Sequence, residues 1–234
     1  SHHNGTYIRM AYSNKIIGPY KIYEKGVLNI KNSPGKDHLA SPDVHIDSKN
    51  EIITMYYHTC FNEDQYTLES SSKDGIFFKS HNIILGSYYF RVFKFKNQLY
   101  SIAKGAKNYG EVYKKVNNEW KIIYKKLIKN IRHTAILVED DIIYLFYSLI
   151  GELQESIYCC ILDIDNFMIT NNYKLLKPSL EYEGFNFPKE KSRIGMENKF
   201  VNQVRDPGIF ISKNDKYLLY SVSGEKGIAI AKFI

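Results

Sequence analysis

Four parts of the chain share one pattern, in which hydrophobic and polar residues alternate, a short polar turn follows, and an aromatic-rich run returns. The four pairs of runs are 41–47 with 51–58, 90–95 with 98–103, 132–138 with 142–148, and 205–211 with 216–223. Alternation with a period of two predicts a β-strand, and two such runs across a short turn predict an antiparallel hairpin. The sequence therefore predicts four similar hairpins, and it shows no sustained helical periodicity.

Further strand-like runs extend these hairpins. We expect them at 6–12, 20–23, 65–71, 77–85 and 227–233. The segment 178–204 is too polar and glycine-rich for another hairpin pair, so we expect an extended loop there. Loops of this length in compact domains tend to be functional.

Repetition of a hairpin-based unit of this size is typical of a β-propeller, whose blades are four-stranded antiparallel meanders. The chain has 234 residues, which together with the repeat favours a single domain spanning 1–234. The fold class we expect is all-β, a propeller whose first blade is incomplete because no inner strand precedes the run 6–12.

A propeller brings the same end of every inner strand to one central cavity, so the residues that open the repeats are expected to meet in space. Those openers are Asp43, Arg91, His133 and Asp206. Side chains from the connections at the same face join them, and these are His2, His3, His38, His58, Lys104, Ser148, Glu181, Glu183 and Glu225. The turns at the opposite end of the hairpins hold only residues of ordinary solvated turns.

Several of these residues also have a structural interpretation. Asp206 stands before a proline and is suited to end an extended segment. Arg91 and Arg205 are suited to pair with neighbouring carboxylates, and His133 is suited to fill a central channel. Their shared position, rather than any one of them, indicates a site.

The bulk composition limits the partners. The net charge is +7, but the lysines are scattered through turns and strand exteriors, so nucleic acid is not an expected partner. Aromatic residues make up 15% of the chain, with 20 Tyr, and tyrosine suits both β-sheets and sugar-binding clefts. No run of about twenty apolar residues occurs, so no membrane span is expected.

Three cysteines, Cys60, Cys159 and Cys160, lack metal-ligand spacing. The adjacent pair points to opposite faces of a strand and is poorly placed to form a disulfide. This favours a reducing, cytoplasmic location.

At the same residues the chain resembles the five-bladed propeller glycosidases, the arabinanase, xylosidase, invertase and levansucrase group that includes glycoside hydrolase family 43. The likeness is to bacterial members in particular, and it extends over nearly the whole chain. It is carried by the stretches 2–9, 38–45, 89–93, 132–135, 182–184 and 201–207. The resemblance implies five blades and a carbohydrate substrate. Arg91 stands where the family has a third carboxylate.

Glycoside hydrolysis needs two carboxyl groups across the scissile bond, one protonated and one ionised. We expect Glu183 as the general acid, with Tyr182 and Phe185 as aromatic cover, and Asp43 or Asp206 as the base that activates water. The resemblance implies inversion, with carboxyl groups roughly 6.5–9.5 Å apart. Substrate contacts are expected from His2, His3, His38, His58, Arg91, His133, Arg205 and Glu225.

The leading hypothesis is therefore a glycoside hydrolase that acts on a small or terminal glycoside. One alternative is a non-catalytic carbohydrate-binding propeller. Another is a metal-dependent propeller that uses His2, His3, His38, His58 and His133, and a protein-interaction propeller is the last. No cofactor is required, although the central channel admits Ca²⁺ or another divalent ion. The sequence does not indicate the sugar, the linkage or the oligomeric state.

Overall fold

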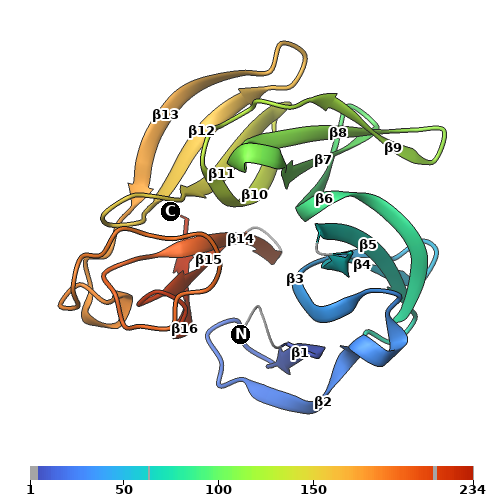
Figure 1. The fold of residues 1–234 in the computed structure, drawn as a ribbon, viewed down its shortest axis with the longest axis horizontal. Helices are drawn as coiled ribbons and strands as arrows, with labels where there is room; N and C mark the ends of the chain where they lie inside the picture. Colours follow the sequence, from blue (N-terminus) through green and yellow to red (C-terminus); the bar gives the residue numbers. More distant parts are fainter. Residues whose placement is uncertain (1–4, 63, 213–214, 234) are drawn as a thin grey trace. The chain divides into compact units, whose positions relative to one another are not determined.

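The structure is a computed structural model that describes residues 5–62, 64–212 and 215–233 (Figure 1). In these ranges the regular structure consists of β-strands and three short 3-10 turns, η1 (Ile30–Asn32), η2 (Ala106–Asn108) and η3 (Glu181–Glu183). The all-β class predicted from the alternating pattern is confirmed. The chain divides into two compact units, one up to Phe90 and one from Arg91 onward. That the two units form a single domain stays a prediction.

The first unit contains a hairpin and a meander. Strand β1 (Tyr7–Tyr12) pairs with β2 (Lys21–Asn29). The meander runs through β3 (Lys36–Asp47), β4 (Ile52–Phe61), β5 (Asp64–Ser72) and the first part of β6 (Lys79–Phe95). The hydrophobic core between the hairpin and the meander contains Ile8, Leu28, Leu39, Met55, Tyr57 and Leu68.

The strands of the second unit form antiparallel meanders in which consecutive strands are neighbours, and the first of these is the end of a seven-stranded order that begins with β3 (Figure 1). The first continues from the end of β6 through β7 (Gln98–Lys104), β8 (Gly110–Val116) and β9 (Glu119–Tyr124). The second consists of β10 (Ile131–Glu139), β11 (Ile142–Leu149), β12 (Ile157–Asp163) and β13 (Met168–Leu176). The third consists of β14 (Arg205–Ser212), β15 (Asp215–Val222) and β16 (Gly227–Lys232).

Strand β11 is buried on both faces. Ile143 and Leu145 belong to one hydrophobic cluster, and Phe146 belongs to a second cluster that also receives Val204 and Leu218. Because successive side chains of a strand point to opposite faces, β11 contributes to the packing on both of its sides. Strand β14 packs along β10 and β11, which fixes the third sheet against the second.

The four hairpins predicted from the sequence are confirmed as β3–β4, β6–β7, β10–β11 and β14–β15. One expectation is wrong: 77–85 and 90–95 were expected to be separate strands, but β6 runs without interruption from Lys79 to Phe95. Tyr89, near its middle, has a φ of 62°. A single residue in the left-handed region redirects the chain here, so no connecting loop is needed.

Three of the predicted inner strands begin with a β-bulge. The register shifts between Ala40 and Asp43 in β3, between Ile131 and Thr134 in β10, and between Arg205 and Gly208 in β14. Asp206 has a φ of 53°, a conformation that aspartate tolerates better than most residues. A bulge changes the direction of the side chains it contains. His133 and Asp206 both lie within such bulges.

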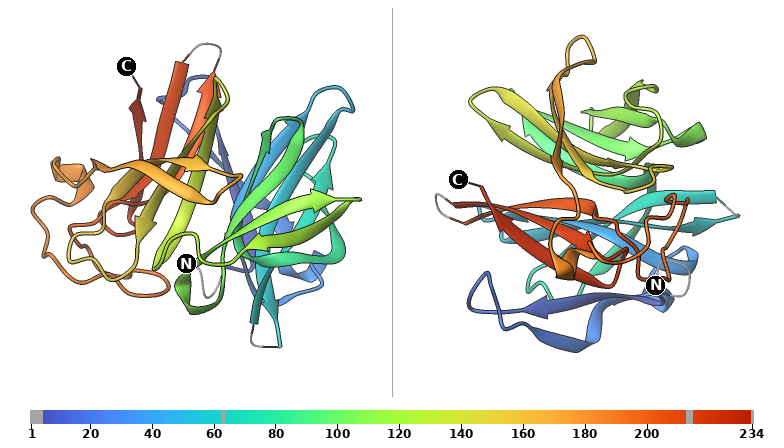
Figure 2. Two further views of the ribbon diagram at one scale, coloured as in Figure 1. Left: turned by 90° about the horizontal axis from the view of Figure 1, so that it is seen from above. Right: turned by 90° about the vertical axis from the view of Figure 1, so that its left-hand side faces the viewer.

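The long segment between β13 and β14 contains no strand, as predicted, and includes the turn η3. It runs beside the last sheet, where it is drawn in orange (Figure 2). Backbone hydrogen bonds attach it, from Ser223 N to Glu183 O at 3.2 Å and from Val204 N to Glu155 O at 3.0 Å. The connection is therefore packed against the second unit along its length.

Replacement of Leu145 by alanine should lower the free energy of unfolding by about 2–5 kcal/mol, because it leaves a cavity in a fully buried position. Leu153→Ala is the matched control, since Leu153 is 61% exposed. Chemical denaturation of both variants tests this. Equal destabilisation by the two substitutions would contradict the packing described for β11.

Candidate functional site

Asp206 and His133 approach each other in the second unit, from the bulges of β14 and β10. His133 Nε2 lies 3.7 Å from Asp206 Oδ1, and the Ser221 hydroxyl donates to Asp206 Oδ2 at 3.3 Å. The Asp206 side chain is 19% exposed and that of His133 is 5% exposed. Within the described ranges, the buried Oδ1 has no hydrogen-bond partner. One carboxyl oxygen is thus held by the fold, and the other faces the imidazole beyond hydrogen-bond distance.

Burial raises the pKa of Asp206 to about 6. The neighbouring carboxylates Glu225 and Glu155 raise this pKa as well, whereas Arg205 and Arg132 act in the opposite direction. A carboxyl group that titrates near neutrality can donate and accept a proton, as a general acid or base must. Asp206 therefore has the protonation behaviour required for proton transfer.

A buried ionic network lies behind this pair. Arg132 forms two hydrogen bonds with Glu155, from Nε to Oε1 at 2.7 Å and from Nη2 to Oε2 at 3.1 Å. Arg205 Nη2 lies 3.4 Å from the same Glu155 Oε2, and Arg205 Nη1 donates to Glu225 Oε1 at 3.1 Å. The two guanidinium groups and two carboxylates balance in charge, which buried ions require.

Lys104, at the end of β7, is affected by the charges of the same ionic network. Burial and the positive charge of Arg132 lower its pKa to about 8, although the charge of Glu155 acts in the opposite direction. Lys104 is 2% exposed. The site therefore includes a third buried cation whose charge depends on pH just above neutrality.

The sequence did not identify Glu155 or assign a role to Arg132. Glu155 lies in the loop between β11 and β12, where a glutamate is unremarkable in sequence. One signal was present: an arginine directly precedes both His133 and Asp206. An arginine in front of each of two site residues could have indicated that both arginines bind the same acidic residue.

Glu183, the expected general acid, is engaged by the chain itself. Its Oε2 accepts from the backbone N–H groups of Ser179 at 2.8 Å and Leu180 at 3.0 Å, and its Oε1 accepts from the Tyr220 hydroxyl at 2.7 Å. Tyr182 and Phe185, the expected aromatic cover, are both more than half exposed. This geometry favours a structural role for Glu183, in holding the long connection against β15.

Arg205 pairs with neighbouring carboxylates, the structural alternative considered for it, and Glu225 is one of these partners. The Arg205 side chain is 1% exposed and is bound by Glu155, Glu225 and the Gln203 side-chain oxygen. Glu225 Oε1 additionally accepts from the backbone N–H of Glu197 at 3.3 Å. Both residues therefore lie beside Asp206 and support it, with little of the guanidinium left for a substrate. Arg91, in the last part of β6, is partly buried.

Asp43 lies in the first unit, where its Oδ2 is 2.9 Å from His45 Nε2. His38 and His58 are buried in the same unit with ring centroids 5.2 Å apart, and the His58 ring lies 5.0 Å from the Tyr89 ring. These residues form an aromatic and histidine cluster at the start of β3 and the end of β4. His2 and His3 lie outside the described residues.

No group of three or more His, Cys, Asp or Glu side chains in the described part of the chain could hold a metal ion. Cys60, Cys159 and Cys160 are free thiols, as expected. None of the helical segments in the described ranges is long and apolar enough to cross a membrane.

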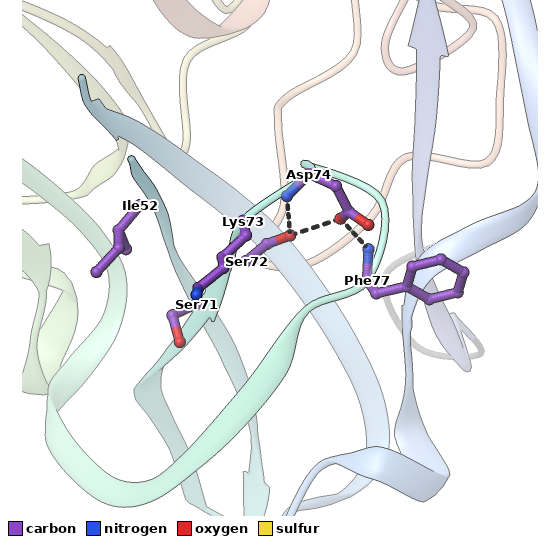
Figure 3. A pocket seen from close by; sticks show the side chains of 6 residues that line it. All are labelled: Ile52, Ser71, Ser72, Lys73, Asp74 and Phe77. Carbon is purple, nitrogen blue, oxygen red and sulfur yellow. Dashed lines mark hydrogen bonds between the residues drawn. The ribbon is translucent and has the colours of Figure 1, made fainter. Parts of the chain in front are cut away.

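A surface hollow of the first unit has a different character (Figure 3). It is lined by Ile52, Ser71, Ser72, Lys73, Asp74 and Phe77. Asp74 Oδ1 accepts from the Ser72 hydroxyl at 2.9 Å and from Phe77 N at 2.9 Å. Asp74 therefore caps its own turn, as the ordinary turn chemistry of the sequence indicates, and none of the predicted site residues lines this hollow.

Comparison with known proteins supports the fold. No protein-family model matches the chain. Uncharacterized protein R118 of Acanthamoeba polyphaga mimivirus is 28% identical over 270 aligned residues, which cover 99% of this chain and 74% of that protein.

The chain is also similar in structure to carbohydrate-active proteins. An exo-1,5-α-L-arabinanase from a bovine ruminal metagenomic library has a TM-score of 0.64 at 11% identity, covering 99% of this chain and 87% of that one. A β-1,2-mannobiose phosphorylase from Listeria innocua has a TM-score of 0.69 at 13% identity, covering 97% of this chain and 65% of that one. A thermostable family-43 glycoside hydrolase has a TM-score of 0.61 at 15% identity, covering 86% of this chain and 74% of that one.

At these identities the similarity shows the fold alone. The described part of the chain is all-β and shares its fold with these three solved proteins. The number of five blades and the likeness to family 43 stay predictions.

Asp206→Asn should stabilise the protein at pH 8 by about 1–3 kcal/mol relative to the native chain. The folded-state pKa of about 6 lies above the ordinary value of 3.8, so ionisation of the folded carboxyl costs stability as pH rises through this window. The difference should therefore vanish below pH 4. Denaturant unfolding between pH 4 and pH 8 measures it.

Asp215→Asn is the control for this experiment. A hydrogen bond from Lys232 lowers the pKa of Asp215, so its removal should not stabilise the protein at pH 8. A native-like or reduced stability of Asp206→Asn at pH 8 would contradict the raised pKa described for Asp206.

Glu183→Gln should lower the free energy of unfolding by about 1–3 kcal/mol, because an amide cannot accept all the hydrogen bonds that the carboxylate accepts. Glu181→Gln, an exposed position in the same turn, is the control and should be neutral. Thermal unfolding measures both. A variant of native stability that has lost turnover would instead support the general-acid role predicted from the sequence.

Proposed function

We propose that this protein is a glycosidase-like enzyme that acts on a small or terminal glycoside, with Asp206 as the residue that transfers the proton. The observation that carries the proposal is the Asp206 carboxyl itself. It has a pKa of about 6, it faces His133, and its Oδ1 makes no hydrogen bond to the described residues. The propeller-like fold shared with glycoside hydrolases supports a carbohydrate substrate.

Hydrolysis of a glycoside requires a proton on the leaving oxygen and activation of a water molecule. With a pKa of about 6, Asp206 is half protonated at about pH 6 and still partly protonated at neutral pH, so its protonated form can supply that proton. Ser221 holds the other oxygen and thereby orients the carboxyl. The charge left on Asp206 after donation is stabilised by Arg205 and Arg132, which lower its pKa through their positive charges.

His133 is placed to assist. Its Nε2 lies 3.7 Å from Asp206 Oδ1, a separation that a small shift converts into a hydrogen bond. A role for Asp43 as the base stays a prediction from the sequence, and within the first unit its Oδ2 lies 2.9 Å from His45 Nε2.

A carbohydrate-binding protein without catalysis is the second candidate. The engagement of Glu183 favours it, since the residue expected to protonate the leaving group is bound on both oxygens by Ser179, Leu180 and Tyr220. If binding is the function, saccharides bind without being cleaved. Calorimetric titration with saccharides that are not hydrolysed would support this candidate.

Asp206→Asn should reduce kcat by about 10²–10⁴-fold, the usual contribution of a general acid or base. A panel of nitrophenyl glycosides first identifies a substrate, and kcat is then compared between the native chain and the variant. Asp215→Asn, at the start of β15 where Asp215 pairs with Lys232, is the matched control and should keep native kcat. Native turnover by a folded Asp206→Asn would remove Asp206 from the mechanism.

A further inference from the structure

Two site residues of the second unit are each preceded by a buried arginine. Arg132 precedes His133 in the bulge of β10, and Arg205 precedes Asp206 in the bulge of β14. Arg132 is 3% exposed and Arg205 is 0% exposed. Each arginine is joined to its site residue by a single peptide bond. The position of the arginine therefore constrains the direction in which the side chain of the site residue points.

One glutamate contacts both arginines. Glu155 Oε1 and Oε2 accept from Arg132 at 2.7 and 3.1 Å, and Oε2 lies 3.4 Å from Arg205 Nη2. The backbone carbonyl of Glu155 also accepts from Val204 N at 3.0 Å, directly before β14. Glu155 is 0% exposed, so it is reserved for these contacts. It belongs to neither strand, and it links the openings of both.

We propose that Glu155 is a positioning residue that, by holding Arg132 and Arg205 together, sets the approach of His133 to Asp206. This inference rests on the proposed function of Asp206. Glu155 acts through the two arginines, and none of the contacts described above joins it directly to the carboxyl of Asp206.

An ionic contact between Glu155 and the two arginines suits this positioning role. A bidentate carboxylate–guanidinium pair fixes both distance and direction, which a single hydrogen bond does not. Without the Glu155 charge, Glu225 would be the carboxylate that still pairs with Arg205, and Asp206 would be the other carboxyl group near the two guanidinium groups. Their mutual repulsion would favour movement of one bulge away from the other, and the separation of His133 from Asp206 would increase.

The test is Glu155→Gln, examined by activity and by nuclear magnetic resonance. We expect kcat to fall about 10- to 100-fold with KM changed less than about threefold, the signature of a misplaced catalytic group. In ¹³C-aspartate-labelled protein, the Asp206 signal, assigned by its loss in Asp206→Asn, should titrate at lower pH than in the native chain. The reason is that the charge of Glu155 raises the pKa of Asp206.

A third readout needs no substrate. In the native chain, Asp206→Asn should alter the titration of the His133 ring, because the two groups interact at 3.7 Å. In the Glu155→Gln background the same substitution should alter it far less. Failure of all glycosides as substrates would refute the proposed function but leave this measurement able to test Glu155.

Glu152→Gln is the matched control. Glu152 lies in the same loop, where its partners are the Tyr158 hydroxyl and Lys174, and its substitution should leave kcat and the Asp206 titration at native values. If Glu155→Gln does not fold, Arg132→Lys replaces it. That variant keeps the buried charge but loses the two-pronged contact, and it should show the same loss of kcat and of coupling to His133.

Native coupling between His133 and Asp206 in the folded Glu155 or Arg132 variant would overturn the proposal. So would a shifted Asp206 titration with native kcat, because Glu155 would then act only as a nearby charge.

Discussion

The second unit depends on a buried group of two arginines and two glutamates. Arg132 and Arg205 share Glu155, and Arg205 also binds Glu225. Removing ions from water is expensive, so such a group persists only when charges balance and hydrogen bonds are satisfied. The loop that carries Glu155, the openings of β10 and β14, and the long connection all meet at these contacts. The ionic network is thus also a junction between segments distant in sequence.

The charges at this junction contribute to the pKa of Asp206. Burial disfavours its charged form, the neighbouring carboxylates add to that effect, and the arginines offset part of it, so the pKa settles at about 6. A surface aspartate would be ionised, and an isolated buried one would resist ionisation much more strongly. The balance of buried charges, rather than any single neighbour, gives a carboxyl group that can gain and lose a proton near neutrality.

Glu183 shows how a carboxyl group is used differently at an earlier position of the chain. It is the more deeply buried of the two, yet it accepts hydrogen bonds on both oxygens and attaches η3 to β15. Asp206 keeps one oxygen without such a bond to the described residues. Whether a carboxyl group is structural or reactive therefore follows from its donors, which belong to residues far away in the sequence.

The sequence alone determined the all-β class, the four hairpins and the long connection. These follow from local alternation and turn chemistry, which a linear pattern records directly. Only the tertiary structure decided that Glu183 is engaged, that β6 is continuous through Tyr89, and that Glu155 joins Arg132 to Arg205. Those facts depend on contacts between segments separated by many residues, and on the cost of burying charge, neither of which is expressed in the order of neighbouring residues.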